Sequence, residues 1–198
     1  MTDLFQEPED ATPLAPAERE GLLQSWITSR SDLNEAEQEN IVTGAAWARR
    51  RRGQKAADLL DEDFAKTLHN QMFGDVWKWA GSYRQTERNI GIEPYRIPAE
   101  TPVLFDDVRH WIEHGTYSPD EIAIRLHHRL VAIHPFPNGN GRHARLMADL
   151  LIERLGGDAF SWGGASLADV GALRAQYVSA LQAADGHDIT ALLAFARS

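Results

Sequence analysis

Residue types suited to binding and transferring charged groups are concentrated in one short stretch, HPFPNGNGRHAR, at residues 134–145. Gly139 and Gly141 flank Asn140 in its middle. Glycine allows successive backbone amides to point into one concavity, and asparagine tolerates unusual dihedral angles. A helix that follows such a loop presents free N–H groups and the positive end of its dipole. The stretch therefore predicts an anion site suited to phosphate.

Charged and titratable side chains flank this loop. Arg142 and Arg145 lie three positions apart, so they share a face of the first turn of the helix expected there. Guanidinium groups bind phosphate oxygens in a forked geometry. His134 precedes the loop, and an imidazole with a pKa near neutrality suits a general base, a role worth about 10²–10⁴ in rate.

Spacing alone leaves other interpretations of the stretch open. Residues 139–144 match a dinucleotide-binding glycine pattern, but that pattern requires a strand before it and a βαβ unit around it. The stretch does not match a P-loop, because it lacks the Gly-Lys-Ser/Thr of that motif. His127, His128 and His134 could contribute to a metal site, although zinc requires three or four ligands in a defined geometry. A glycine-rich connection with capping arginines accounts for the same residues.

The elements that must position this stretch are predicted to be helices, because apolar residues recur at helical spacing. Ser118 as N-cap with Pro119 in the first turn predicts one clear helix start, and Ser31 is expected to cap the first long helix. The expected helices cover residues 16–25, 31–52, 61–81, 101–115 and 118–134, one from about Gly141, and two within 166–198.

Residues 82–100 have a different character. They are polar, contain Gly91 and Pro94, and carry β-branched residues at Ile90, Ile92 and Ile97. This pattern predicts a loop with a short β-hairpin. The fold class expected from the whole pattern is all-α, a helical bundle with one small hairpin.

Composition narrows the classes of function. The 198 residues are 43% hydrophobic and 25% charged, as in a globular protein with a core. The net charge of −9 argues against a broad nucleic-acid-binding face. The absence of cysteine excludes disulfides and thiol catalysis. No apolar run has membrane-spanning length and the N-terminus is acidic rather than signal-like, so we expect no membrane partner and a cytoplasmic location.

The stretch at 134–145 resembles the signature of the Fic family, H-x-F-x-[D/E]-G-N-G-R-x-x-R, and matches all of its fixed positions except one. FGDVWKWAGSYR at 73–84 and YVSALQAADGHDITALLAF at 177–195 resemble flanking Fic segments. The resemblance covers residues 55–197, and the whole chain is similar to the bacterial Fic branch named mobile mystery protein B. It implies an N-terminal extension at 1–54 followed by a Fic domain at 55–198.

The resemblance implies a protein adenylyltransferase, a nucleotidyltransferase that moves AMP from ATP to a Ser, Thr or Tyr hydroxyl of a target protein. His134 would deprotonate that hydroxyl. The glycine-rich loop would hold the α-phosphate, and the two arginines would bind the β- and γ-phosphates. The implied nucleotide-binding residues are Gly139, Asn140, Gly141, Arg142 and Arg145.

Asn138 is the position that departs from the signature. The family usually has Asp or Glu there, and that carboxylate holds Mg²⁺ between the phosphates. Asparagine keeps an oxygen ligand but loses the negative charge, so the resemblance implies weaker Mg²⁺ binding at Asn138. Altered nucleotide use or weak activity would be consistent with this change.

Two further features follow from the resemblance. Many Fic proteins are restrained by a helix with the pattern [S/T]-x-x-x-E-[G/N], and Glu39 followed by Asn40 fits its last two positions, although Glu35 stands where Ser or Thr is expected. The predicted restraint is an ion pair between Glu39 and Arg145. The hairpin would pair with an extended target segment through Arg88, Asn89, Ile90, Gly91, Ile92, Tyr95 and Ile97.

Alternative functions stay open at this point. The same loop could transfer a different phosphorylated group or remove AMP. A non-enzymatic alternative is a catalytically weak nucleotide-binding protein that forms one half of a toxin–antitoxin-like pair, with a cognate regulator as its partner. The oligomeric state does not follow from the residues.

Overall fold

The computed structural model of the chain describes residues 14–51, 55–164 and 170–198. Within these ranges the regular structure is helical, and β-structure is limited to one isolated bridge between Leu22 and Trp77. The all-α prediction is therefore confirmed. The helices are α1 (Pro16–Arg19), α2 (Arg30–Arg50), α3 (Ala56–Leu59), α4 (Glu62–Phe73), the 3-10 helix η1 (Pro94–Arg96), α5 (Ile97–His114), α6 (Pro119–Ile133), α7 (Asn140–Arg154), α8 (Val170–Asp185) and α9 (Thr190–Arg197).

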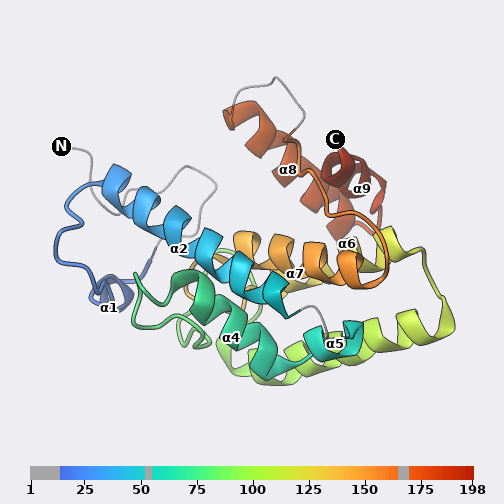
Figure 1. The fold of residues 1–198 in the computed structure, drawn as a ribbon, viewed down its shortest axis with the longest axis horizontal. Coiled ribbons are helices and arrows are strands. Elements are labelled where there is room, and N and C mark those ends of the chain that lie inside the picture. The colour runs from blue at the N-terminus through green and yellow to red at the C-terminus, as the bar shows by residue number, and fades with distance from the viewer. Residues whose placement is uncertain (1–13, 52–54, 165–169) are drawn as a thin grey trace.

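Helices α6 and α7 lie side by side at the centre of the fold and are joined by the loop 134–139 (Figure 1). Helix α5 packs against α6, and α4 packs against α7 and, more extensively, against α2. Helices α8 and α9 pack together, with α9 against α6. Helices from both halves of the chain thus surround the pair that carries the 134–145 stretch.

Local capping signals explain where several helices begin. Ser118 caps α6 by accepting a hydrogen bond from the Glu121 amide, and Asp61 caps α4 in the same way through Phe64. The N-cap of α2 is Ser29 rather than the expected Ser31. Ser29 is favoured as the N-cap because the Asp32 carboxylate accepts a hydrogen bond from the backbone N–H of Ser29 at 2.9 Å, which completes a capping box.

The predicted β-hairpin is not formed. Residues 85–93, which we call the flap, contain neither a helix nor a strand, and Pro94 then begins η1. Ile97 is the first residue of α5 and is fully buried. Its β-branched side chain therefore belongs to a helix and not to a strand of the predicted hairpin. A hairpin would satisfy its backbone groups in a ladder; here a side chain, that of Arg84, binds the flap carbonyls instead.

One hydrophobic core joins the N-terminal part of the chain to the rest. Leu33 of α2 belongs to the same buried cluster as Leu68 of α4 and Met147 of α7. The predicted division between residues 1–54 and 55–198 falls beside residues 52–54, which lie outside the described ranges. This division therefore stays a prediction.

Gly44 marks a close approach of α2 to α4. A Cβ atom built on Gly44 would lie 2.7 Å from the carbonyl oxygen of Gln71 and 2.8 Å from the amide of Met72. Because these are backbone atoms of a packed helix, they cannot move aside as the end of a side chain can. Any side chain at residue 44 must therefore push α2 away from α4.

We expect Gly44→Val to lower the free energy of unfolding by about 1–3 kcal/mol, the usual cost of overpacking a well-packed contact. Urea unfolding followed by circular dichroism measures this. Ala46→Val, on the exposed face of the same helix, is the matched control and should change the value by less than about 0.5 kcal/mol. Equal losses in the two variants would show that Gly44 is not a packing constraint.

Candidate functional site

The loop between α6 and α7 is fastened by a buried asparagine. Asn140 Oδ1 accepts a hydrogen bond from the Phe136 amide at 2.9 Å, and Asn140 Nδ2 donates to the Phe136 carbonyl at 2.8 Å. Asn140 is only 3% exposed. These bonds fix the side chain inside the loop but use only one of the two N–H groups of Nδ2, so the nucleotide-binding role implied for Asn140 stays a prediction. Its backbone amide, in the first turn of α7, remains available to an anion.

A buried histidine that sequence analysis missed supports the loop from below. His69 on α4 accepts a hydrogen bond from the Gly81 amide at Nδ1 and donates from Nε2 to the Asn138 carbonyl, both at 3.0 Å. Its ring stacks on Phe136 at 3.8 Å between centroids. Burial holds the pKa of His69 well below its usual value. The neutral ring is thus a fixed bridge between α4 and the loop, and nothing in its local sequence marks it.

The N-terminus of α7 has the geometry expected of an anion site. Gly139 caps it with φ +79°, a left-handed conformation, and provides no side chain to occupy the first amides. One side of Gly139 lies against Phe73, since an added Cβ would lie 2.6 Å from that ring. At Gly141 the nearest atom to an added Cβ is Tyr177 Oη at 3.7 Å, an ordinary van der Waals distance. The first turn of α7 is thus less tightly packed at Gly141 than the loop is at Gly139.

The first motif arginine is held by an acidic residue of α2. Arg142 Nη1 lies 2.6 Å from Glu37 Oε2, and the other oxygen of Glu37 accepts from Trp77 Nε1 at 2.7 Å. Glu37 is 4% exposed, whereas Glu39 lies on the exposed side of the helix. The predicted ion pair between Glu39 and Arg145 is not formed. Packing against α4 and α7 turns the face that contains Glu37 inward, and the short pattern Glu39–Asn40 could not reveal this.

The second motif arginine is held by aromatic contacts. The Arg145 guanidinium lies over the Tyr177 ring, 5.4 Å from its centroid, and Arg145 Nε donates to the Gly141 carbonyl at 3.3 Å. The Tyr177 hydroxyl in turn pairs with His127 Nε2 at 3.0 Å. Helix α8 thus contributes Tyr177 to the site, a residue that sequence analysis did not single out.

The three histidines considered for a metal site have separate surroundings. His127 is fully buried with Tyr177, and burial lowers its pKa to about 3. His128 pairs with Asp185 at 2.8 Å. In the part of the chain that the structure describes, no group of three or more His, Cys, Asp or Glu residues is arranged to hold a metal ion.

His134 lies at the C-terminal end of α6 in a left-handed conformation, with φ 55°. Its side chain is nearly buried, at 9% exposure. Burial, and then the positive charges of Arg84 and Arg88, lower the pKa of His134 to about 4. The expected near-neutral pKa is therefore not found. Above pH 5 the ring is neutral, which is the form that can accept a proton.

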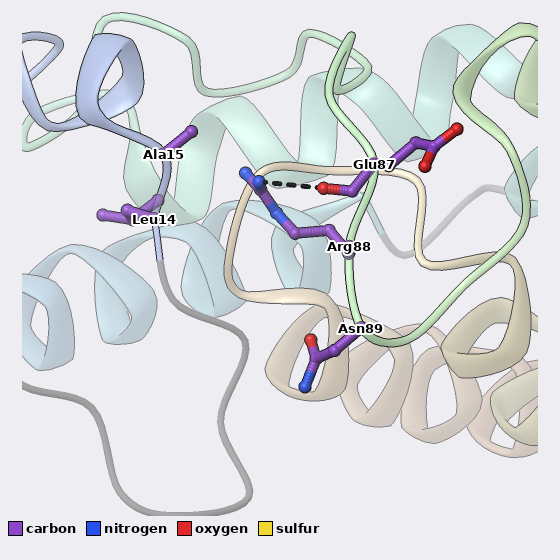
Figure 2. A pocket seen from close by; sticks show the side chains of 5 residues that line it. All are labelled: Leu14, Ala15, Glu87, Arg88 and Asn89. Carbon is purple, nitrogen blue, oxygen red and sulfur yellow. Dashed lines mark hydrogen bonds between the residues drawn. The ribbon is translucent and has the colours of Figure 1, made fainter.

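The flap covers His134 and is itself held by the N-terminal segment. A Cβ built on Gly91 would lie 2.6 Å from His134 Cβ, so this part of the flap rests directly on the histidine. Arg88 forms a buried ion pair with Glu18 of α1. Figure 2 shows the surface hollow beside this contact, with Leu14 on one side and Arg88 and Asn89 on the other.

The residues predicted to dock a target therefore divide into three groups. Arg88 and Ile97 are withdrawn from the surface, the first in its ion pair and the second in the core. Gly91 and Ile92 are directed to the end of α6, where the Ile92 amide donates to the Ile133 carbonyl at 3.4 Å. Asn89, Ile90 and Tyr95 are exposed, and Gly91 is also exposed although it rests on His134.

Asn138 does not present a cation site in this arrangement. Its Oδ1 accepts from the Gly139 amide at 2.5 Å and lies 3.3 Å from Arg142 Nη2. An oxygen that faces a guanidinium group is a poor ligand for Mg²⁺, which prefers charged carboxylates. The predicted metal-binding role of Asn138 thus does not fit the observed geometry.

Comparisons with known proteins agree with this geometry. The model of the Fic/DOC family matches residues 59–152. Protein adenylyltransferase Fic of Drosophila melanogaster is 33% identical over 103 residues, which are 50% of this chain and 21% of that protein. Protein adenylyltransferase fic-1 of Caenorhabditis elegans is 31% identical over 106 residues, which are 52% of this chain and 21% of that protein. The chain spans about a fifth of the length of these curated relatives.

Solved structures show the same fold. Fic-1 (residues 134–508) of C. elegans superposes with a TM-score of 0.59 at 26% identity, covering 81% of this chain and 47% of that one. BepC of Bartonella tribocorum with bound AMPPNP superposes with a TM-score of 0.65 at 18% identity, covering 92% and 97%. Residues 59–152 therefore form a domain of the Fic/DOC family.

Proposed function

We propose that the chain is a protein adenylyltransferase that transfers AMP from ATP to a hydroxyl group of a target protein. The observation that carries the proposal is a neutral, buried histidine at the end of α6, joined by one short loop to the N-terminal end of α7, with two arginines on the first two turns of that helix. The similar Fic proteins of D. melanogaster and C. elegans support the proposal, because both are named protein adenylyltransferases.

In the proposed reaction the backbone amides of the first turn of α7, around Gly141, hold the α-phosphate, and Arg142 and Arg145 neutralise the β- and γ-phosphates. His134 accepts the proton of the target hydroxyl. The hydroxyl oxygen forms a bond to the α-phosphorus, and the bond from that phosphorus to the bridging oxygen breaks, which releases pyrophosphate. The negative charge of bound triphosphate favours imidazolium, so ATP would make His134 more basic than it is in the closed site.

Mg²⁺ enters the proposal only as the ion that accompanies ATP in solution. It would supply charge neutralisation of the phosphates. Because Asn138 Oδ1 faces Arg142, no step of the proposed reaction depends on a metal bound at Asn138. A cytoplasmic location is part of the proposal, since the reaction consumes ATP.

The position of the label in ATP distinguishes the proposed activity from its alternatives. The protein is incubated with a host lysate and ATP labelled on either the α- or the γ-phosphate. AMP transfer labels protein from α-labelled ATP and not from γ-labelled ATP, because the γ-phosphate leaves in pyrophosphate. Labelling from γ-labelled ATP and not from α-labelled ATP would indicate phosphoryl transfer, because the α-phosphate then leaves in ADP. Nucleotide binding by calorimetry without any labelling would instead support the nucleotide-binding partner.

We include in the proposal that α2 restrains the site through Glu37. The Glu37 carboxylate is paired with the guanidinium group of Arg142, which would otherwise bind a phosphate, and a hydrogen bond from Trp77 fixes Glu37. A triphosphate must displace this ion pair before both arginines can reach it. The restraint that the sequence placed at Glu39 is thus reassigned to Glu37.

Glu37→Gly should raise the rate of self-labelling from α-labelled ATP at least about tenfold, which corresponds to removing roughly 1.4 kcal/mol of competition for Arg142. Glu39→Gly is a matched control, because it introduces the same helix-weakening residue two positions away on the exposed side. Its rate should stay close to that of the unmodified protein. An equal increase in both variants would mean that loosening α2, rather than freeing Arg142, is what activates the enzyme.

Target binding is proposed at the exposed part of the flap and η1. Tyr95 is 81% exposed and Ile90 is 41% exposed. Ile90 lies on the flap and Tyr95 on η1, which leads into α5, and Gly91 of the flap rests on His134. A target segment that contacts them would pass close to the histidine. Whether the partner is a host target or a cognate regulator is decided by which protein carries the label.

A further inference from the structure

Arg84 is a buried cation whose hydrogen bonds, within the described residues, all go to backbone carbonyls. Its residue exposure is 1%. None of the ion pairs formed by the described residues includes it. Burial lowers its pKa, as expected for a charge withdrawn from water without a direct counter-ion. An arginine in this position needs an explanation, because desolvating an unpaired charge is costly.

The four acceptors of Arg84 come from two places that are distant in the chain. Nε donates to the His134 carbonyl at 2.6 Å, and Nη2 reaches the Ile133 carbonyl at 3.4 Å. Nη1 donates to the Thr86 carbonyl at 2.9 Å, and Nη2 also bonds the Ile92 carbonyl. One side chain therefore connects the end of α6 with both ends of the flap.

The C-terminal end of α6 suits a positive charge. Its last carbonyls have no intrahelical donor and carry the negative end of the helix dipole. The backbone reinforces the same connection, since the Arg84 amide donates to the Pro135 carbonyl at 2.9 Å. A Cβ on Gly91 would meet both His134 Cβ, at 2.6 Å, and Arg84 Nη2, at 2.7 Å. Flap, arginine and histidine turn are thus packed as one unit.

We propose that Arg84 is a positioning residue that holds the left-handed turn at His134 and the two ends of the flap in a single geometry. The proposal rests on the proposed function for its catalytic consequence, because His134 must be aligned with the hydroxyl that the flap brings to it. Its structural content, a flap locked to the end of α6, is independent of that function.

The planar fork of arginine is essential to this role. Guanidinium presents five N–H donors in fixed directions, whereas the lysine ammonium presents three donors from one atom. Arg84→Lys therefore keeps the positive charge but cannot reach both α6 and the two ends of the flap. Arg84→Gln removes the charge as well. Comparing the two separates the effect of the charge from that of the fork.

Turnover gives the first measurement. At a temperature where each variant is folded by circular dichroism, both should lower kcat for AMP transfer by about 10²-fold, the cost of misplacing a catalytic group by about 1 Å. The KM for ATP should stay within about threefold, because the phosphate-binding arginines are not touched. A smaller fraction of active protein would also lower the apparent kcat without changing KM, so the kcat is calculated per folded protein and the proposal depends as well on the measurements below.

Two further measurements do not need activity. Hydrogen exchange followed by NMR should show faster exchange of the Ile92 amide in both variants, because its flap end is released. NMR titration of the His134 ring should show a pKa raised by about one unit in Arg84→Gln, since one neighbouring positive charge is gone, and little change in Arg84→Lys. The other charge that acts on this ring is Arg88, which pairs with Glu18 and is unchanged.

Arg109→Lys is the control, because Arg109 on α5 also donates to a backbone carbonyl, that of Leu60, yet does not contact the flap. It should leave kcat and Ile92 exchange unchanged. Unchanged Ile92 exchange in both Arg84 variants would overturn the proposal, as would a wild-type kcat in Arg84→Lys. If the unmodified protein and Glu37→Gly transfer no AMP, the proposed function fails, and the exchange and titration measurements still decide the role of Arg84.

Discussion

Replacement of His134 by alanine should lower the rate of AMP transfer by about 10²–10⁴-fold, the contribution expected of a positioned general base. The affinity for ATP should change little, because the amides of α7 and the two motif arginines are independent of the ring. Labelling from α-labelled ATP measures the rate, and isothermal titration calorimetry measures the affinity. Using Glu37→Gly as the parent protein gives the largest signal.

His128→Ala is the matched control for this experiment. His128 lies on the same helix and pairs with Asp185, away from the loop. It should transfer AMP at the parent rate. If His134→Ala retained more than about a tenth of the parent rate, proton transfer to His134 would not be part of the reaction, and the loop would be only a phosphate-binding site.

Acidification should destabilise the protein strongly between pH 6.5 and 4. Burial is the main cause that lowers the pKa of His127 to about 3 and of His134 and His143 to about 4. In the unfolded chain these groups protonate near pH 6.5. The unfolded state therefore binds more protons than the folded state in this window, so the free energy of unfolding falls as the pH falls.

The size of the effect follows from the same values. At pH 5 each of the three histidines costs about 2 kcal/mol relative to pH 8, and His69 acts in the same direction. Asp149 opposes them, since burial raises its pKa to about 6 and the folded state then holds its proton more tightly. The raised pKa of Asp149 adds about 1 kcal/mol to the free energy of unfolding at pH 5. The net loss, on the order of 5 kcal/mol, is comparable to the whole stability of an ordinary domain.

Denaturant unfolding at pH 8 and pH 5 tests this expectation. His143→Gln removes one buried titrating group and should reduce the difference between the two pH values by about 2 kcal/mol. His110→Gln, at an exposed position of α5, should leave the difference unchanged. A free energy of unfolding that is the same at both pH values would mean that the buried histidines are hydrated or already protonated in the folded protein.

Local signals predicted much of the scaffold. Ser118 and Asp61 mark helix starts through their own side chains, and Gly115 ends α5 in a left-handed conformation, with φ 58°. The glycines around Asn140 predicted a loop before a helix, and this arrangement is confirmed. Each of these features depends on neighbours within a few residues, so a sequence displays both partners together.

The flap illustrates where such signals fail. Its β-branched residues and its glycine fit a hairpin, but the carbonyls of Thr86 and Ile92 bond to Arg84 and not to each other. Gly91 is required for two reasons: its φ of +103° is rarely adopted by other residues, and His134 lies directly beneath it. The residue types of the flap were thus informative, but the groups that explain them, above all His134, lie in a distant part of the chain.

The sequence by itself determined which kinds of group the loop at 134–145 can present, because its glycine amides and its arginines belong to the loop itself and to the start of α7. Tertiary structure alone decided which groups they meet. Glu37 rather than Glu39 reaches Arg142 because packing against α4 and α7 sets which face of α2 is buried. The pKa of His134 departs from neutrality for the same kind of reason: burial beneath the flap and the nearby Arg84 arise only when distant segments come together.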